Sequence, residues 1–186
     1  MKFLKWAIVI LLVLGGLFYF IGMPYMKSQT KKISPERTAT YTEDGMDMLV
    51  TYSAPYKKGR VIFGELVPYG KVWRTGANEP TTFETKTAIT INGKELAAGT
   101  YSLWTIPRSE NWDVIFNSEV PKWGVTLLSG GKETTRNPKA DVLQLTVPTA
   151  KTNAEVERLT IAFSKTAQLY LSHSWDTTAV RVPINK

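Results

Sequence analysis

The stretch NWDVIFN, residues 111–117, alternates between two kinds of side chain. One face carries Trp112, Val114 and Phe116, and the other face carries Asn111, Asp113 and Ile115. A period of two is the spacing of a β-strand that buries one face and leaves the other in water. The stretches DVLQLTVP (141–148) and RLTIAFS (158–164) repeat this pattern. We therefore predict antiparallel sheets with one buried face.

Turn residues divide the chain after residue 45 into short segments of the same kind. The Asn-Gly pair in INGK, residues 91–94, favours a two-residue hairpin turn, and VPYG, residues 67–70, favours a type I turn. No stretch in this region keeps a helical period. About nine or ten short strands are expected. The predicted fold is all-β, an antiparallel, jelly-roll-like β-sandwich over residues 45–186.

An uncharged run, WAIVILLVLGGLFYFIGMPYM, occupies residues 6–26. At 1.5 Å per residue, about 20 such residues match the roughly 30 Å hydrocarbon core of a bilayer. Lys2 and Lys5 precede the run, and no small-residue cleavage site follows it. We predict an uncleaved signal anchor, a single N-terminal transmembrane helix over residues 1–26. The polar residues 27–44 are predicted to form a tether between this helix and the domain.

Composition excludes several classes of site. The net charge of +7 does not favour nucleic-acid binding, because most of the basic excess lies in the first 37 residues and not on the predicted domain. The chain has no cysteine, which excludes disulfides, thiolate nucleophiles and zinc-thiolate sites. Its single histidine cannot form a multi-histidine metal site. We therefore expect no metal, no cofactor and no nucleic-acid partner.

No motif identifies a catalytic residue. His173 alternates with Leu171 and Trp175, so it is expected on the buried face of a strand. Neither a G-x-S-x-G nucleophile elbow nor a phosphate-binding loop occurs in the chain. These observations favour a binding protein over an enzyme.

The stretch YGKVWRTGANEPT, residues 69–81, concentrates aromatic and polar side chains around two glycines. The candidate ligand-binding residues are Lys71, Trp73, Arg74, Asn78 and Glu79. An aromatic ring, a guanidinium fork, an amide and a carboxylate are suited to hold a sugar, an anion or a peptide end. The same groups also suit a structural role, in which Arg74 bonds to carbonyls and Glu79 neutralises it. Both interpretations stay open on the sequence.

The signature FGELVPYGKVWRTGAN, residues 63–78, resembles that of the domain of unknown function 2911, a bacterial family abundant in Bacteroidota. KWG (122–124) and WDTTAVRVPI (175–184) are similar to the same family, so the resemblance covers roughly residues 46–186. Members of the family look secreted or surface-lying, which implies an exported domain. The resemblance implies no activity, substrate or catalytic residue. The uncleaved anchor departs from the removable signal sequence of the family.

We expect a membrane-anchored envelope protein that binds a small ligand or an envelope protein through residues 68–79. Its predicted location is the bacterial inner membrane, with a single pass and the domain in the periplasm. The reason is that a short basic tail followed by an apolar run is how exported chains begin.

Two alternatives are kept. A carbohydrate hydrolase would use Glu79 with Asp113 or Glu65, and it requires two of these carboxylates to face each other across a cleft. A purely structural envelope component would need no pocket beside Trp73.

Overall fold

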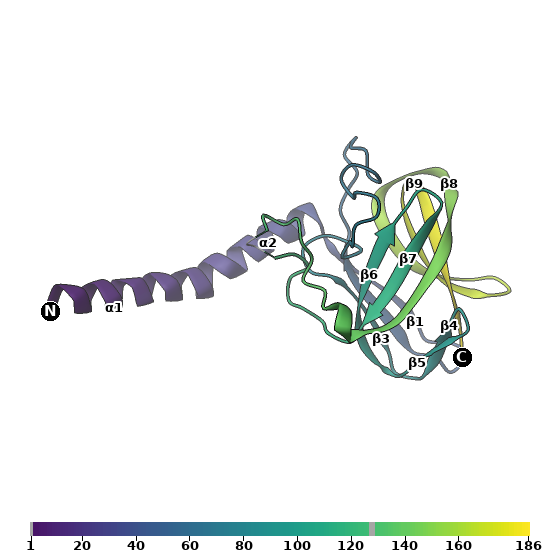
Figure 1. The fold of residues 1–186 in the computed structure, drawn as a ribbon, viewed down its shortest axis with the longest axis horizontal. Coiled ribbons are helices and arrows are strands. Elements are labelled where there is room, and N and C mark those ends of the chain that lie inside the picture. Colours follow the sequence, from purple (N-terminus) through teal and green to yellow (C-terminus); the bar gives the residue numbers. More distant parts are fainter. Residues whose placement is uncertain (1, 127–128) are drawn as a thin grey trace.

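The computed structural model describes residues 2–126 and 129–186. Its N-terminal part is one long helical rod made of α1 (Lys2–Leu17), the π-helical turn η1 (Phe18–Gly22) and α2 (Met23–Ile33). The rod projects away from the remainder of the chain (Figure 1). From Phe3 to Ile33 it is long and apolar enough to cross a membrane, and the window with the highest hydropathy is not buried against the domain. This confirms the predicted apolar N-terminal helix and fits a membrane anchor or a signal sequence.

The rest of the chain forms nine antiparallel strands in one sheet. They are β1 (Glu36–Tyr41), β2 (Met48–Ser53), β3 (Thr81–Thr85), β4 (Ile89–Ile91), β5 (Lys94–Leu96), β6 (Gly99–Pro107), β7 (Asn111–Asn117), β8 (Asp141–Lys165) and β9 (Leu169–Asn185). A short 3-10 helix, η2 (Pro138–Ala140), precedes β8. Their order across the sheet is β1-β2-β3-β6-β7-β8-β9-β4-β5.

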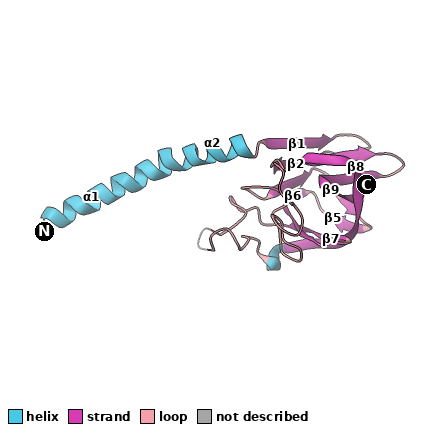
Figure 2. Ribbon diagram, turned by 90° about the horizontal axis from the view of Figure 1, so that it is seen from above, coloured by secondary structure: helices cyan, strands magenta, loops and turns pink. Residues whose placement is uncertain are grey.

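The sheet is folded on itself through β8. The first part of this strand, to Pro148, pairs with β7, and the part from Thr149 to Lys165 pairs with β9. The two halves of the sheet therefore face each other across the core (Figures 1 and 2). The hairpin of β4 and β5 leaves β3, joins the half that contains β9, and returns the chain to β6. The predicted antiparallel sandwich is confirmed, although β8 and β9 are longer than the short strands expected.

The predicted hairpin turn at residues 91–94 is also confirmed. Asn92 and Gly93 join β4 to β5, and both have positive φ, 49° and 75°. These angles are those that a two-residue hairpin turn requires, because the turn must match the right-handed twist of the strands.

The two faces of β7 differ from the simple expectation. Trp112, Val114 and Phe116 are buried in the core between the halves of the sheet, as the alternation predicts. Asp113 and Ile115 on the other face are buried as well. The segment after β7 covers this face, and the carbonyl of Glu119 there accepts a hydrogen bond from Ser102 of β6 at 2.6 Å. The alternation of side chains along a strand carries no information on a segment that packs over its second face. The prediction that one face of this strand is exposed to solvent was therefore wrong.

The structure differs from the predicted tether over residues 27–44. The helix continues to Ile33 and β1 begins at Glu36, so only Ser34 and Pro35 lie between them. The strand was not recognisable, because β1 lies at the edge of the sheet and most of its side chains on both faces are exposed. The ordered domain therefore starts directly after the helix.

Candidate functional site

A pocket of about 420 Å³ lies where the end of α2 meets the domain, and we call it the junction pocket. Its size is within the range of roughly 300–1,000 Å³ that is usual for small-ligand sites. It is lined by Ile33, Ser34, Pro55, Tyr56, Lys58, Arg60, Leu66, Val67, Trp73, Arg74, Gly76, Ala77 and Trp175. These residues come from the end of α2, from the long connection between β2 and β3, and from β9.

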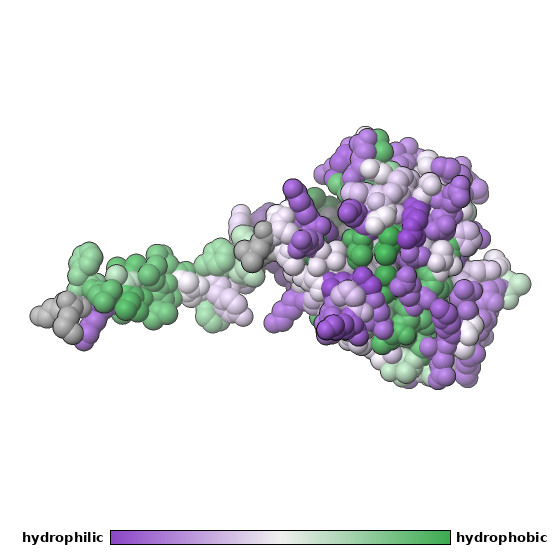
Figure 3. Space-filling view, in the orientation of Figure 1, coloured by the Kyte–Doolittle hydropathy of each residue, from purple (hydrophilic) through white to green (hydrophobic). Residues whose placement is uncertain are grey.

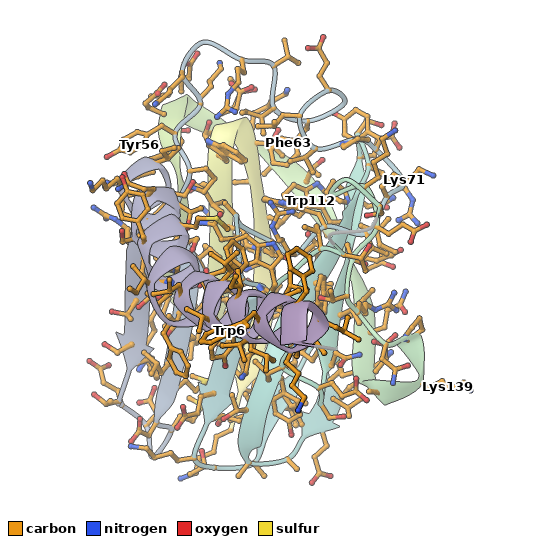
Figure 4. All side chains as sticks on the ribbon, turned by 90° about the vertical axis from the view of Figure 1, so that its left-hand side faces the viewer. Trp6, Tyr56, Phe63, Lys71, Trp112 and Lys139 are labelled. Carbon is orange, nitrogen blue, oxygen red and sulfur yellow. The ribbon has the colours of Figure 1, made fainter. Side chains whose placement is uncertain are left out.

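Four aromatic side chains form a cluster beside the pocket. The rings of Trp73 and Trp175 are stacked, with centroids 6.1 Å apart, and Phe63 contacts Trp112 edge to face at 4.9 Å. Figure 4 shows Phe63 and Trp112 behind the helix and Tyr56 beside it. Such aromatic pairs add to the energy of burial, so the cluster is a rigid wall.

The backbone around Arg74 is held firmly. Trp73 and Thr105 exchange two backbone hydrogen bonds, of 2.7 and 2.9 Å, and Thr81 donates to the carbonyl of Arg74 at 3.1 Å. The indole of Trp73 donates to the carbonyl of Gly76 at 3.0 Å. The loop therefore presents the Arg74 side chain from a fixed position.

The guanidinium of Arg74 is the unusual group of the site. Its Nε is buried and has no hydrogen-bond partner among the described residues. Burial lowers the pKa of this arginine, because desolvation disfavours the charged form. A buried polar group without a partner is costly and needs an explanation.

Glu79 does not neutralise Arg74, which corrects the structural interpretation of the sequence. Its Oε2 lies 2.9 Å from Nζ of Lys31, and its Oε1 lies 3.1 Å from Nζ of Lys27. Lys31 also reaches Glu36 at 3.0 Å. Burial would raise the pKa of Glu79, but the hydrogen bonds to its carboxylate outweigh burial and hold the pKa below the usual value. Glu79 therefore fastens α2 to the domain.

The other predicted residues are separated in space. Lys71 is exposed and lies at the outer edge of the domain (Figure 4). Asn78 has a positive φ of 63°, and its Nδ2 is buried without a partner in the part of the chain that the structure describes, but it does not line the junction pocket. The structure thus places Trp73 and Arg74 together in this pocket. Glu79 lines a second pocket of about 470 Å³ near Lys27.

Several pocket residues were missed by sequence reasoning. The loop after β2 contributes Tyr56, Lys58 and Arg60, and the core strand β9 contributes Trp175. The only signal for the loop was the stretch APYKKGR at positions 54–60, which contains one aromatic and three basic residues. Such a run does not differ from an ordinary solvated turn.

The signature stretch, residues 63–78, and the KWG stretch, residues 122–124, meet beside the pocket. The backbone N–H of Gly124 donates to the carbonyl of Asn78 at 2.9 Å. A Cβ added at Gly124 would lie 2.9 Å from that same oxygen and would also collide with Arg74. Thr75, which is buried and β-branched, has a positive φ of 56°. Strained backbone of this kind persists only where the surroundings enforce it, and it is concentrated at functional sites.

The carboxylates of the hydrolase alternative do not line the junction pocket. Asp113 lies 2.9 Å from Arg108 and accepts a hydrogen bond from Thr146 at 2.7 Å. Glu65 is exposed, and Glu79 is engaged by α2. Within residues 2–126 and 129–186, no group of three His, Asp or Glu side chains is arranged to hold a metal ion.

His173 lies in the core, as predicted, and is almost fully buried. Neither ring nitrogen has a partner among the described residues. Burial lowers its pKa from 6.5 to about 4, so the imidazole is neutral at physiological pH.

Comparison with known proteins identifies a family without a described activity. Neither the curated proteins nor the solved structures gave a match. The family described as protein of unknown function 2911 matches residues 34–184, which cover the nine described strands except Asn185, the last residue of β9. The match begins at Ser34, where the helix ends and the junction pocket starts. The chain therefore belongs to the family of proteins that contain the domain of unknown function 2911.

Proposed function

We propose that this protein is a membrane-anchored binding protein of the bacterial envelope and that its junction pocket holds an anionic ligand. The observation that carries the proposal is Arg74, which lines the pocket and whose Nε is buried without a hydrogen-bond partner among the described residues. A guanidinium binds carboxylate or phosphate oxygens through two parallel hydrogen bonds. A bound anion would supply the acceptors that the protein does not provide.

The charge around the pocket supports the same ligand class. Lys58, Arg60 and Arg74 line it, and its lining contains no carboxylate. Convergent cations without neutralising acids raise the local concentration of anions. A polar network that only supported the fold would be expected to satisfy its own buried groups.

The anchor is part of the proposal. The ion pairs from Lys27 and Lys31 to Glu79 join the helix to the domain, which supports an uncleaved helix. We place the protein in the bacterial inner membrane with a single pass and the domain in the periplasm. The intact mass of the membrane-extracted protein, and protease treatment of spheroplasts, test the retained helix and the orientation.

The alternatives receive less support. A purely structural component needs no pocket beside Trp73, and a pocket lies there. A carbohydrate hydrolase requires two facing carboxylates, but Glu79 and Asp113 are engaged in separate ion pairs. We therefore favour binding without catalysis.

The test is thermal unfolding of the full-length chain in phosphatidylcholine nanodiscs with a panel of small anions, glycans and muropeptides. A ligand at a hundred times its Kd stabilises by about 2.7 kcal/mol, which raises the Tm of a domain of roughly 150 residues by roughly 5–10 °C. We expect Arg74→Gln to stay folded and to lose this shift, whereas Lys71→Gln, an exposed control in the same loop, keeps it.

Two results would count against the proposal. One is a panel in which no anion shifts the Tm of the wild type, while Arg74→Gln unfolds. That result would mean that Arg74 stabilises the fold and binds no small ligand, and the next candidates would be protein partners. The other is a ligand shift of equal size in the wild type and in a folded Arg74→Gln.

A further inference from the structure

We propose that the ligand of the junction pocket is a single-chain amphiphile with an anionic head group, and that it enters from the surface of the membrane that holds the helix. This inference rests on the proposed function above and adds the class and the source of the ligand. It depends on where the pocket lies, on its apolar wall and on its cations.

The pocket lies next to the membrane. The uncharged run ends at Met26, and α2 continues to Ile33, which itself lines the pocket. The rise from Met26 to Ile33 is about 10 Å at 1.5 Å per residue. A head-group layer is about 5–8 Å thick, so the pocket begins just beyond it. Figure 3 shows the apolar helix leading directly to the more hydrophilic domain.

The wall of the pocket is more apolar than a small anion needs. Its buried side is formed by Trp73 and Trp175, whose rings are stacked. Of the other lining residues, Ile33 at the end of α2 is 63% exposed, and Leu66 of the loop is 45% exposed. Exposed apolar side chains that border a pocket mark a site for an apolar partner. An alkyl chain would cover these side chains, whereas an inorganic anion would leave them in water.

The cations select the head group. Lys58 and Arg60 lie on the exposed loop, whereas Arg74 is half-buried, and its Nε has no partner among the described residues. A phosphate or carboxylate head can meet these three side chains while the chain lies along the aromatic wall. The volume of about 420 Å³ is near the lower end of the usual range, which favours one chain over two.

The experiment measures whether a lipid chain leaves the bilayer and reaches the buried tryptophans. The full-length chain carries Trp6→Phe, because Trp6 is the only tryptophan in the helix. It is placed in phosphatidylcholine nanodiscs that contain dibromostearate, whose bromine atoms quench indole fluorescence on close contact. Brominated monoacylglycerol provides the same chain with a neutral head, and acetate and inorganic phosphate provide an anion without a chain.

We expect dibromostearate to quench the domain fluorescence in a saturable way in the Trp6→Phe protein and equally in its Lys71→Gln derivative. Arg74→Gln should weaken this effect by about tenfold or more, since a hydrogen bond to a charged group contributes at least that factor. The neutral amphiphile should be weaker by a similar factor. Leu66→Gln should weaken the quenching by dibromostearate.

Three results would overturn the inference. If small anions raise the Tm but dibromostearate does not quench, the proposed function stands and the ligand is a small anion without a chain. If the neutral amphiphile quenches as strongly as dibromostearate, the pocket does not recognise an anionic head. If neither small anions nor amphiphiles act, both the ligand class and the proposed function fail.

Discussion

Lowering the pH should destabilise the domain through its single histidine. His173 is buried in the core, and neither of its ring nitrogens has a partner among the described residues. Burial lowers its pKa in the folded state from 6.5 to about 4. The unfolded chain therefore binds a proton between these two values that the folded domain does not bind. Stability is full above about pH 6.5, falls as the pH drops toward 4, and stays reduced by a constant amount below that.

The size of the effect follows from these two pKa values. The full difference corresponds to about 3 kcal/mol once both states are below their pKa, at 1.36 kcal/mol for each pH unit. Between pH 7 and pH 4.5 the loss is roughly 2–3 kcal/mol. For a domain of roughly 150 residues this lowers the Tm by roughly 5–10 °C.

The assay is urea unfolding of the full-length chain in nanodiscs at several pH values, for the wild type and for His173→Leu. Carboxylates such as Glu79 also lose stability in acid, but they do so in both proteins. The difference between the two curves therefore isolates the histidine, and the wild type should lose roughly 2–3 kcal/mol more than the variant. Curves that run parallel from pH 7 to pH 4.5 would refute the reasoning, because they would mean that the imidazole reaches water or a partner.

Two further predictions concern the loop and the anchor. Gly124→Ala should lower the stability of the domain by about 1–3 kcal/mol, because the new Cβ would lie 2.9 Å from the carbonyl of Asn78. Thermal unfolding measures this, and a Tm equal to that of the wild type would show that the two loops do not meet as described. Glu79→Gln should cost about 1 kcal/mol or less, because Lys31 and Lys27 are partly exposed partners. It should nevertheless speed amide hydrogen exchange in residues 27–33, and unchanged exchange there would mean that the ion pairs do not hold the helix.

Much of the fold was accessible from the sequence, because alternation and turn chemistry act locally. The burial of Trp112, Val114 and Phe116 on one face follows from their spacing. The turn at Asn92 and Gly93 follows from the ease with which these residues adopt positive φ. The covering of the opposite face of β7 depends on how the chain runs after this strand, as at Glu119, and a local sequence pattern carries no information on that.

The candidate site was less accessible, because it is assembled from segments that are distant in the chain. Arg74 and Glu79 are close in sequence, and an ion pair between them was one of the two interpretations. The loop between them contains positive φ at Thr75 and Asn78, so the chain turns and the two side chains separate. Lys31, which takes the place of Arg74 beside Glu79, belongs to a segment that was predicted to be a tether.

The separation of Arg74 from Glu79 would let one short loop hold the helix and also serve the proposed pocket. The lysines of α2 satisfy the carboxylate, so the anchor is held without using the arginine. The arginine is half-buried, and its Nε has no partner among the described residues. An arginine of the same loop that only stabilised the fold would lower its energy by pairing with the nearest acid. Because Glu79 is instead held by Lys31, the cost of the unpaired Nε is best explained by an acceptor that arrives from outside the chain.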